Sequence, residues 1–428
     1  MSGGNSLRVC FISRRFFPAI SGMSVYALNL VRELADCGHD VTMVSQYRND
    51  RAGVSVYGGG PPPHVPGVKV LGRESLGEQR VGDGLPASFE QDVEDMVATV
   101  EREHRRRPFD LIHAQYGYPC GLAALEASRR LGLPNVVSIQ GGDGHWVGTC
   151  CGTHKQAMLA VLGHAGALLI GSRSFAEEVR GHHGTPLERF TLVPGATDTR
   201  RFHPRDEPSL GAMGNPPVLL YHGRVDARKG VMELLDAMRM LTRNGRELKL
   251  VVSGIGPDLN AVRNRVTTLG LRDSVELTGH ASYDDAPAVY RRGDLFVSPT
   301  YSEGFSNTIL EAMATGLPIV STRAVGVVDC LEDGRNALLV PPRDARALAD
   351  AIARMLDDPE LRRRLARMAL AEVRELYSWQ AVGRRIQQVY GQLTGTGPDT
   401  GWTRLYDPAT TVDTADPSCR FRSAPHLL

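Results

Sequence analysis

The chain has 428 residues, enough for two sizeable domains; 42% of them are hydrophobic and 23% charged, as is ordinary for a globular protein. The formal net charge is +1, so bulk charge gives no indication of a nucleic-acid partner. Seven cysteines are scattered without the spacing of a disulfide framework, and no apolar run approaches the roughly 18 residues that span a bilayer. Together with a polar N-terminus that has no signal-peptide core, these features predict a cytoplasmic protein.

The first half of the chain alternates short apolar runs with helical patterns. Buried strands are expected at 7–12 and 40–45, separated by a helix whose apolar stripe ends at Gly38. Residues 46–88 are rich in Gly and Pro and predict a long excursion from this rhythm. The alternation then resumes with a helix near 89–106, a strand at 110–114, a helix near 120–131, and strands near 135–139 and 167–171. This order is typical of a doubly wound parallel α/β sheet.

A second α/β series follows a Pro- and Gly-rich segment near 206–217. We expect its strands at 218–223, 248–254, 275–279, 295–298, 319–321 and 337–340, and helices over 344–393. The sequence thus predicts two Rossmann-like domains, 1–205 and 206–378, with a ligand in the cleft between them at the carboxyl ends of the strands. A helix at 379–394 is expected to cross back to the first domain, and residues 395–428 to form a loosely ordered tail.

Two carboxylates eight positions apart, Glu303 and Glu311, flank the expected start of a helix in the second domain. Residues 306–308 (Ser, Asn and Thr) are good N-cap residues. Free backbone N–H groups and the helix dipole favour an anion at such a place. Because carboxylates repel phosphate, the two glutamates suit hydroxyl groups instead. The pattern indicates a sugar nucleotide, with its phosphates at the turn and its ribose and sugar on either side.

Two cations lie upstream in a turn, 223–230, that directly follows a strand and precedes a helix. Arg224 and Lys229 are five positions apart, so both can reach a diphosphate, and glycines at 223 and 230 let the backbone approach closely. A surface turn with solvated charges is the alternative interpretation. Residues 254–257, with Gly254 after the next strand, form a second glycine turn that is also typical of a plain strand–helix connection.

With these motifs the chain resembles the retaining glycosyltransferases of family four, which have the two-domain GT-B fold, over about residues 7–393. Residues 303–320 are similar to the family's signature of two glutamates, the second continuing as EAMA, one residue, G, one residue, P. Residues 223–230 resemble its "GR", four residues, "KG" element. Residues 193–204 are similar to its "PNGVD…F.P" segment, with Gly195 where Asn is usual, and residues 38–41 resemble its "GHEV" strand entry.

The resemblance implies a role for each matching residue. Arg224 and Lys229 would hold the diphosphate of a nucleotide-sugar donor and stabilise the charge of the leaving group. Glu303 would bind the hydroxyls of the donor sugar, and Glu311 the ribose. The other implied donor-binding residues are Gly22, Gly223, Gly254, Gly304, Phe305, Ser306, Asn307 and Thr308. The family moves the sugar to a hydroxyl acceptor by front-face attack, without a divalent metal, so we expect no cofactor; a glycan, a lipid-linked group or a small molecule would be the acceptor.

In the first domain, Gly22 matches the second glycine of the family's glycine loop, and Ser21 replaces the first. Relatives often have a His where this chain has Gln140, which forms hydrogen bonds but cannot act as an acid or base. Asp143 matches the family's acid and is a candidate binder of acceptor or sugar. His145 is either a substitute for the missing His or a structural residue at a helix start. Asp143 and His145 join the candidate catalytic residues; Gln140 and Tyr116 are acceptor-side candidates.

Three questions stay open from the sequence. His145, Cys150, Cys151 and His154 form a compact group, but their spacing fits no standard zinc site, so a packed or acceptor-lining loop is preferred and no metal is expected. The basic and aromatic residues 14–17 and the arginines 105–107 would contact an anionic acceptor or a membrane surface, or be solvated. A sugar-nucleotide epimerase and a non-catalytic or partner-activated sugar-nucleotide-binding protein are the alternative functions, which the transferase-type donor residues disfavour.

Overall fold

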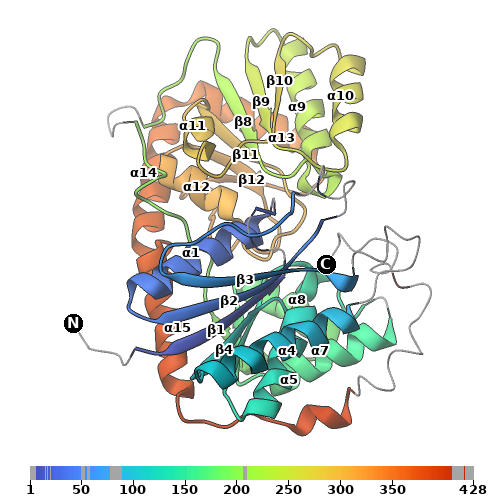
Figure 1. Ribbon diagram of the computed structural model, residues 1–428. Helices are drawn as coiled ribbons and strands as arrows, with labels where there is room; N and C mark the ends of the chain where they lie inside the picture. Colours follow the sequence, from blue (N-terminus) through green and yellow to red (C-terminus); the bar gives the residue numbers. More distant parts are fainter. Residues whose placement is uncertain are drawn as a thin grey trace. The chain divides into compact units, whose positions relative to one another are not determined.

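The computed structural model describes residues 6–14, 16, 18–19, 21–49, 54, 58–77, 89–149, 151–205, 210–406 and 419. The chain forms two compact units, one of residues 1–194 and 382–428 and one of residues 195–381, each built on a parallel sheet (Figure 1). The functional boundaries expected at 205 and 378 stay predictions. Among the described residues, no helix combines the length and the apolar character that crossing a membrane requires.

The sheet of the first unit has the strand order β3-β2-β1-β4-β5-β6-β7. Its strands are β1 Arg8–Arg14, β2 Asp40–Tyr47, β3 Val68–Glu74, β4 Leu111–Gln115, β5 Asn135–Ile139, β6 Ala167–Ile170 and β7 Phe190–Leu192. Its helices are α1 Gly22–Asp36, α4 Glu90–Arg106, α5 Leu122–Leu131, α6 Gly142–His145, α7 Gly152–His164 and α8 Arg173–His183. In Figure 1, α4, α5 and α7 lie on one side of this sheet and α1 on the other. Because both faces are covered, β1, β4 and β5 are buried along their whole length, which explains their continuous apolar runs.

Strand β3 lies inside the region 46–88, where the sequence predicted only an excursion. It pairs in parallel with β2, from Val41 opposite Val68 to Tyr47 opposite Glu74. As the outer strand of the sheet it is only partly buried, with Lys69, Gly72 and Arg73 exposed. An edge strand of this kind needs no continuous apolar run, so its signal was lost among the neighbouring glycines and prolines.

The sheet of the second unit has the order β10-β9-β8-β11-β12-β13. Its strands are β8 Val218–His222, β9 Lys249–Ser253, β10 Val275–Gly279, β11 Leu295–Ser298, β12 Ile319–Thr322 and β13 Leu338–Val340. Its helices are α9 Val231–Arg243, α10 Leu259–Thr268, α11 Ala286–Tyr290, α12 Asn307–Thr315, α13 Ala345–Asp357 and α14 Pro359–Leu376, and a short helical turn covers Ala227–Lys229. This arrangement places the loops after β9, β8, β11 and β12 next to one another along one edge of the sheet.

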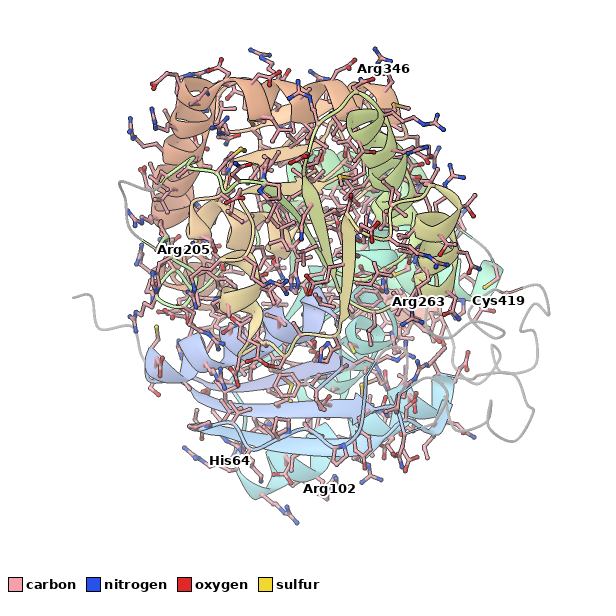
Figure 2. The ribbon with its side chains drawn as sticks, turned by 90° about the horizontal axis from the view of Figure 1, so that it is seen from above. His64, Arg102, Arg205, Arg263, Arg346 and Cys419 are labelled. Carbon is pink, nitrogen blue, oxygen red and sulfur yellow. The ribbon has the colours of Figure 1, made fainter. Side chains whose placement is uncertain are left out.

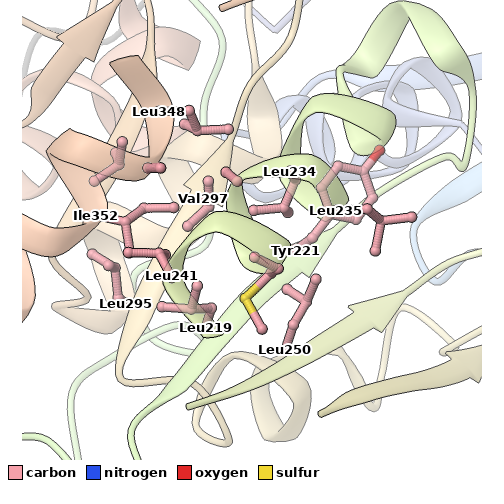
Figure 3. Close-up of a cluster of buried hydrophobic side chains, with 14 of the residues drawn as sticks. Leu219, Tyr221, Leu234, Leu235, Leu241, Leu250, Leu295, Val297, Leu348 and Ile352 are labelled. Carbon is pink, nitrogen blue, oxygen red and sulfur yellow. The ribbon is translucent and has the colours of Figure 1, made fainter. Parts of the chain in front are cut away.

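The core of the second unit lies on both faces of its sheet. Leu219 and Tyr221 of β8 pack on one face against leucines of α9 and Ile352 of α13, as Figure 3 shows. The intervening Leu220 points to the opposite face, where it joins a second buried cluster that includes Ile309 of α12. The alternation along β8 therefore fixes α9 and α12 on opposite faces, and both helices begin at the same edge of the sheet.

Helix α15, Trp379–Leu393, ends one residue before the expected 394 and spans the division between the units at 381 and 382. In the first unit, the hydroxyl of Tyr390 lies 2.7 Å from Nδ1 of His113 on β4. Residues 395–406 depart from the expected loose tail: Trp402 and Tyr406 are buried, and Nδ1 of His164 at the end of α7 lies 2.8 Å from Oδ2 of Asp399. The turn Gly401–Arg404, which contains Trp402, contacts α7.

Candidate active site

The loops that follow β8 and β9 are packed backbone against backbone. The amide of Gly223 donates to the carbonyl of Ser253 at 3.0 Å, and the amide of Val225 donates to that of Ile255 at 2.9 Å. A Cβ atom added at Gly254, where φ is +146°, would lie 1.8 Å from the carbonyl oxygen of Gly223. Only glycine fits this approach, so the glycine turn at 254 positions the turn that carries Arg224.

The loop after β11 is held from two sides. The amide of Tyr301 donates to the carbonyl of Arg228 at 3.0 Å, and the amide of Glu303 donates to that of Val325 at 2.9 Å. A Cβ atom at Gly326, where φ is +74°, would lie 2.1 Å from the carbonyl oxygen of Glu303. These backbone contacts fix the place from which Glu303 extends its side chain.

The structure brings Lys229 and Glu303 together. Their Nζ and Oε1 atoms lie 2.6 Å apart, and both side chains are partly exposed, at 24% and 18%. The two candidates therefore belong to one site, in which a carboxylate compensates the charge of an ammonium group. A partly exposed ion pair can rearrange when a ligand arrives, because solvent screens its charges.

Arg224 lies beside a second acid, Asp226, with 3.6 Å between Nε and Oδ2. That separation is too long for a hydrogen bond, and the buried Nε–H of Arg224 has no partner among the described residues. Burial acts to raise the pKa of Asp226, but the hydrogen bonds and charge of Arg228, with the charge of Arg224, outweigh it and lower the pKa to about 2. Asp226 therefore remains ionised while Arg224 keeps a donor available.

Helix α12 begins beside this turn, since a Cβ atom at Gly223 would lie 3.9 Å from Cγ2 of Thr308. Ser306 is the N-cap residue, but its side chain accepts no hydrogen bond from a backbone amide of the helix; its hydroxyl lies 3.2 Å from that of Thr308. By contrast, side chains cap the starts of α1, α8, α13 and α14. The first turn of α12 thus keeps backbone N–H groups that no N-cap side chain binds.

Gly195, the departure from the family's usual Asn, packs on this helix start. A Cβ atom there would lie 2.7 Å from Cδ1 of Phe305 and 3.0 Å from Oδ1 of Asn307. Phe305 in turn lies against Tyr377, with 5.7 Å between ring centroids. A side chain at 195 would displace Phe305 or Asn307, so the glycine suits the local packing of this chain.

Glu311 lies on the second turn of α12 and is buried. The hydroxyl of Tyr290, at the end of α11, donates to Oε2 of Glu311 at 2.7 Å. Burial raises the pKa of Glu311 to about 7, while the hydrogen bond from Tyr290 and the charge of Arg201 act weakly in the opposite direction. Its other oxygen, Oε1, has no hydrogen-bond partner among the described residues. The carboxyl group is thus fixed at one oxygen, and the other remains able to accept.

In the first unit, Gln140 ends a chain of side-chain hydrogen bonds at the carboxyl ends of β1, β4 and β5. The hydroxyl of Ser13 donates to Oε1 of Gln115 at 2.6 Å. Nε2 of Gln115 donates to the carbonyl of Met23 at 2.9 Å and to Oε1 of Gln140 at 2.7 Å. The hydrogen bond from Gln115 engages Oε1 of Gln140 and so fixes the orientation of this side-chain amide. The Nε2 group of Gln140 is then available as a donor. No described residue accepts from it.

Asp143 is fully buried beside Gln140 and binds the backbone. Its carboxylate accepts from the amides of Gly117 at 2.8 Å, Gly141 at 2.8 Å and Gln140 at 3.1 Å. Burial raises its pKa to about 6 and outweighs the lowering effect of these three donors. This acid thus organises the turn that carries Gln140.

His145 and Tyr116 are also in the interior of the first unit. Nδ1 of His145 lies 2.8 Å from Oε1 of Glu178, and its ring packs against Phe175 at 4.6 Å. Tyr116 is 4% exposed and has a positive φ of +88°. Gly22 is the first residue of α1, and Ser21 caps this helix by accepting from the amide of Ser24 at 3.1 Å. Ser21, in place of the family's glycine, thus supplies a helix cap.

The residues considered for anionic or membrane contacts differ in how exposed they are. Arg14 is 5% exposed and lies over the ring of Phe89, 4.2 Å from its centroid, and Phe16 is buried. Arg106 pairs with Glu103 at 2.8 Å, and Arg107 with Asp40 at 2.5 Å. Residues 15 and 17 lie outside the described residues, as does Cys150. Arg14 and Phe16 thus lie in the interior, whereas Arg105, Arg106 and Arg107 are exposed, and their contact with an anionic acceptor or a membrane surface stays a prediction.

Sequence reasoning missed three residues that shape these sites. Tyr290 binds Glu311, Gln115 orients Gln140, and Gly326 makes room for Glu303. Gln115 had a usable signal, since a polar residue at the carboxyl end of a buried strand needs a partner. Tyr290 and Gly326 are brought in by packing between distant segments, which no local pattern reports.

Comparison with known proteins agrees with this geometry. The family described as "Glycosyl transferase 4-like domain" matches residues 21–196, and "Glycosyl transferases group 1" matches residues 203–371. An alpha-D-kanosaminyltransferase of Streptomyces kanamyceticus is 36% identical over 238 residues, 54% of this chain and 61% of that protein. A D-inositol 3-phosphate glycosyltransferase of an Arthrobacter species is 27% identical over 412 residues, 87% of this chain and 92% of that protein.

Solved structures show the same fold. Sucrose-phosphate synthase of Thermosynechococcus elongatus has a TM-score of 0.73 at 22% identity, covering 90% of this chain and 99% of that chain. Anabaena HepE in complex with UDP-glucose has a TM-score of 0.69 at 19% identity, covering 90% of this chain and 100% of that chain. With two parallel α/β units, family matches to each and these relatives, the chain belongs to the GT4-like glycosyltransferases of the GT-B fold.

Proposed function

We propose that this glycosyltransferase uses a nucleotide-diphosphate sugar and transfers the sugar with retention of its anomeric configuration. The observation that supports this most directly is the Lys229–Glu303 pair on loops fixed to one another, with the uncapped start of α12 beside Arg224. Cations and the backbone N–H groups of a helix start suit a diphosphate, and a carboxylate beside them suits sugar hydroxyls. Anabaena HepE, which shares the fold, was solved with UDP-glucose.

In the proposed reaction, the bond between the sugar C1 and the diphosphate oxygen breaks while a bond from C1 to the acceptor oxygen forms on the same face. The acceptor proton passes to the departing phosphate oxygen, so no protein nucleophile is needed. Arg224, Lys229 and the first amides of α12 stabilise the charge that grows on the diphosphate. Glu303 accepts hydrogen bonds from the sugar hydroxyls, and Lys229 compensates its charge.

Glu311 is proposed to accept from the ribose hydroxyls. Tyr290 holds Oε2, so Oε1 is the oxygen that would accept. A ribose hydroxyl would favour the ionised carboxylate, because hydrogen bonds to the charged form lower the pKa of a buried acid. Donor binding should therefore release a proton from Glu311 near neutral pH.

On the acceptor side, the Nε2 group of Gln140 is proposed to donate to a hydroxyl of the sugar or acceptor, in the place of the family's His. Its fixed direction is set by Gln115. We assign Asp143 and His145 to positioning this segment, because their side chains are buried on protein partners. We propose that transfer needs no added divalent cation, and that the protein acts in a reducing compartment such as the cytoplasm, since its seven cysteines lack the spacing of a disulfide framework.

A thermal-shift screen over nucleotide sugars tests the donor. UDP-glucose and nucleotide-linked amino sugars belong in the panel because of HepE and the kanosaminyltransferase. Donor binding should raise the melting temperature by mass action. Proton NMR of the transferred or hydrolysed sugar, without added Mg²⁺ or Mn²⁺, then reports the anomeric configuration. An inverted product would contradict retention, and tight donor binding with neither transfer nor hydrolysis would favour the non-catalytic binder.

A further inference from the structure

Three metal-ligating side chains meet in the first unit: Cys151, His154 and Cys419. Their ligand atoms all lie within 4.8 Å of one another. Nδ1 of His154 is 3.1 Å from Sγ of Cys151 and 3.3 Å from Sγ of Cys419, which is 265 positions away in the sequence. We propose that these residues bind a zinc ion, which the comparisons with relatives do not assign.

The spacing of the ligand atoms fits a tetrahedral zinc ion. With Zn–S bonds of about 2.3 Å and Zn–N bonds of about 2.0 Å, such a site places sulfur and nitrogen ligands about 3.6 Å apart. The observed separations of 3.1 and 3.3 Å require shifts of only a few tenths of an ångström. Two thiolates and one imidazole fill three positions, and a water molecule or a further ligand fills the fourth.

The protein environment also suits a bound metal. His154 and Cys419 are 5% and 2% exposed, and Cys151 is half-buried. The ring of His154 packs against that of Tyr118, with 4.7 Å between centroids, which restricts its rotation. A restricted imidazole and two buried or half-buried sulfurs lose little freedom when a metal binds, so the site is largely preformed.

The zinc ion would join the tail to the start of α7. Cys151 is the N-cap residue of this helix and His154 lies in its first turn. Cys419, labelled in Figure 2, comes from the tail, whose earlier residue Trp402 is already buried against the first unit. The segment that carries Gln140 and Asp143 ends where α7 begins, so a metal bound at Cys151 and His154 would anchor the C-terminal end of that segment. His145, expected in this group, pairs with Glu178 instead.

Two metal-free states compete with this proposal. The sulfur atoms of Cys151 and Cys419 are close enough to form a disulfide after a small movement. They are also at hydrogen-bonding distance from the imidazole without any metal. Zinc is favoured because it uses all three groups together, whereas a disulfide leaves the imidazole without a role.

The experiment is metal analysis of the full-length protein, purified with a reductant, incubated with Zn²⁺ and freed of excess metal. We expect about one zinc per chain. Cys151→Ser, His154→Ala and Cys419→Ser should each lose it. Cys37→Ser and His64→Ala are matched controls with exposed side chains, His64 being labelled in Figure 2, and should keep it.

Two measurements on the unmodified protein guard against variants that fail to fold. Replacement of zinc by Co²⁺ should give thiolate-to-cobalt charge-transfer bands and the strong visible bands of tetrahedral cobalt. Alkylation followed by peptide mapping should show Zn²⁺ protecting Cys151 and Cys419 but not Cys37. The proposal is overturned by a protein that binds no zinc, by zinc retained in both Cys variants, or by a Cys151–Cys419 disulfide under reducing purification.

Discussion

Lys229 and Glu303 form a close ion pair, 2.6 Å from Nζ to Oε1, although they extend from loops after two different strands, β8 and β11. In the proposed reaction, this pair supplies two charges at the donor. An ammonium group suits the diphosphate, and a carboxylate suits the sugar hydroxyls. Each side chain also keeps the other compensated before a donor binds.

Lys229→Ala and Glu303→Ala should each lower kcat/KM by about 100- to 1,000-fold, the range for removal of one preorganised charge or donor at a reacting group. Stability should fall by at most about 1 kcal/mol, because the pair is partly exposed. Initial-rate kinetics and thermal melts check both statements. Arg246→Ala is the control: it breaks an ion pair with Asp357 in the same unit, 2.7 Å long, and should leave kinetics unchanged. Normal turnover of both folded variants would remove these residues from the reaction.

Glu311→Gln should make the protein more stable above pH 7 and weaken its binding of the donor. Burial raises the pKa of Glu311 from its ordinary 4.5 to about 7, so the unfolded chain ionises first as the pH rises. This carboxyl group therefore favours the folded state fully below pH 4.5, and the contribution is lost between about pH 4.5 and 7. Gln keeps the acceptor for Tyr290 but has no charge to bury.

We expect the Gln variant to be more stable than the parent above pH 7, by up to about 3 kcal/mol, with little difference near pH 4.5. Urea denaturation at both pH values measures this. Donor affinity, measured by calorimetry at pH 8, should fall in the same variant, because an amide oxygen accepts more weakly than a carboxylate. If the free energy of unfolding changed with pH in the same way in both proteins, Glu311 would not have the raised pKa of a buried carboxyl group.

Asp143→Asn separates a positioning role from a catalytic one. The carboxylate accepts from the amides of Gly117, Gln140 and Gly141, and Asn would turn an NH₂ group toward one or more of these donors. We expect a loss of about 1–3 kcal/mol in the free energy of unfolding. Chemical denaturation measures it, with Asp198→Asn, on the loop after β7, as a partly exposed control. An unchanged stability together with abolished turnover would instead place Asp143 in the chemistry.

Gln115 should act on catalysis only through Gln140. Gln115→Met removes the donor that fixes the Gln140 amide, and we expect kcat/KM to fall about 10-fold, as it should in Gln140→Ala. The double variant should then be no worse than Gln140→Ala alone, since both changes remove one interaction.

Gln46→Met is the matched control for this cycle, because Gln46 is also a buried glutamine at the end of a strand, 1% exposed, with its Nε2 on the carbonyl of Asp92. Its effect should add to that of Gln140→Ala. Fully additive effects of Gln115→Met and Gln140→Ala would show that Gln115 only stabilises the fold.

Much of the fold was predictable because buried parallel strands have dense apolar runs with clear ends. The strands at 135–139, 275–279 and 295–298 have the predicted bounds, and the helix at 379–393 ends one residue before its predicted end. Strand β3 was missed because an edge strand is only half covered, and β7 because three residues give no periodicity. Local sequence patterns thus identify buried strands and helices, but they do not report contacts that form only when distant segments pack together.

The candidate residues show the same limit. Glu303, Lys229 and Arg224 could be chosen from sequence because they lie in short loops that follow strands, at spacings that resemble the family's motifs. The burial of Asp143 and the bond from Tyr290 to Glu311 depend on segments far apart in the chain, and no spacing reports them. The Cys419 contact with His154 is the extreme case, because a tail residue completes a group that begins at Cys151.

The backbone contact at Gly223 and Gly254 limits how this enzyme can be redesigned. Chimeric glycosyltransferases are built by exchanging loops, and here the turn at 223–230 touches the loop at 254–257 through main-chain atoms with no space to adjust. The loop that carries Glu303 is bound in the same manner to the turn on one side and to Gly326 on the other. A single loop taken from a homologue would not fit the main-chain atoms of the two loops that it touches here. An exchange meant to change the proposed donor specificity should therefore replace all of these loops together, from one homologue.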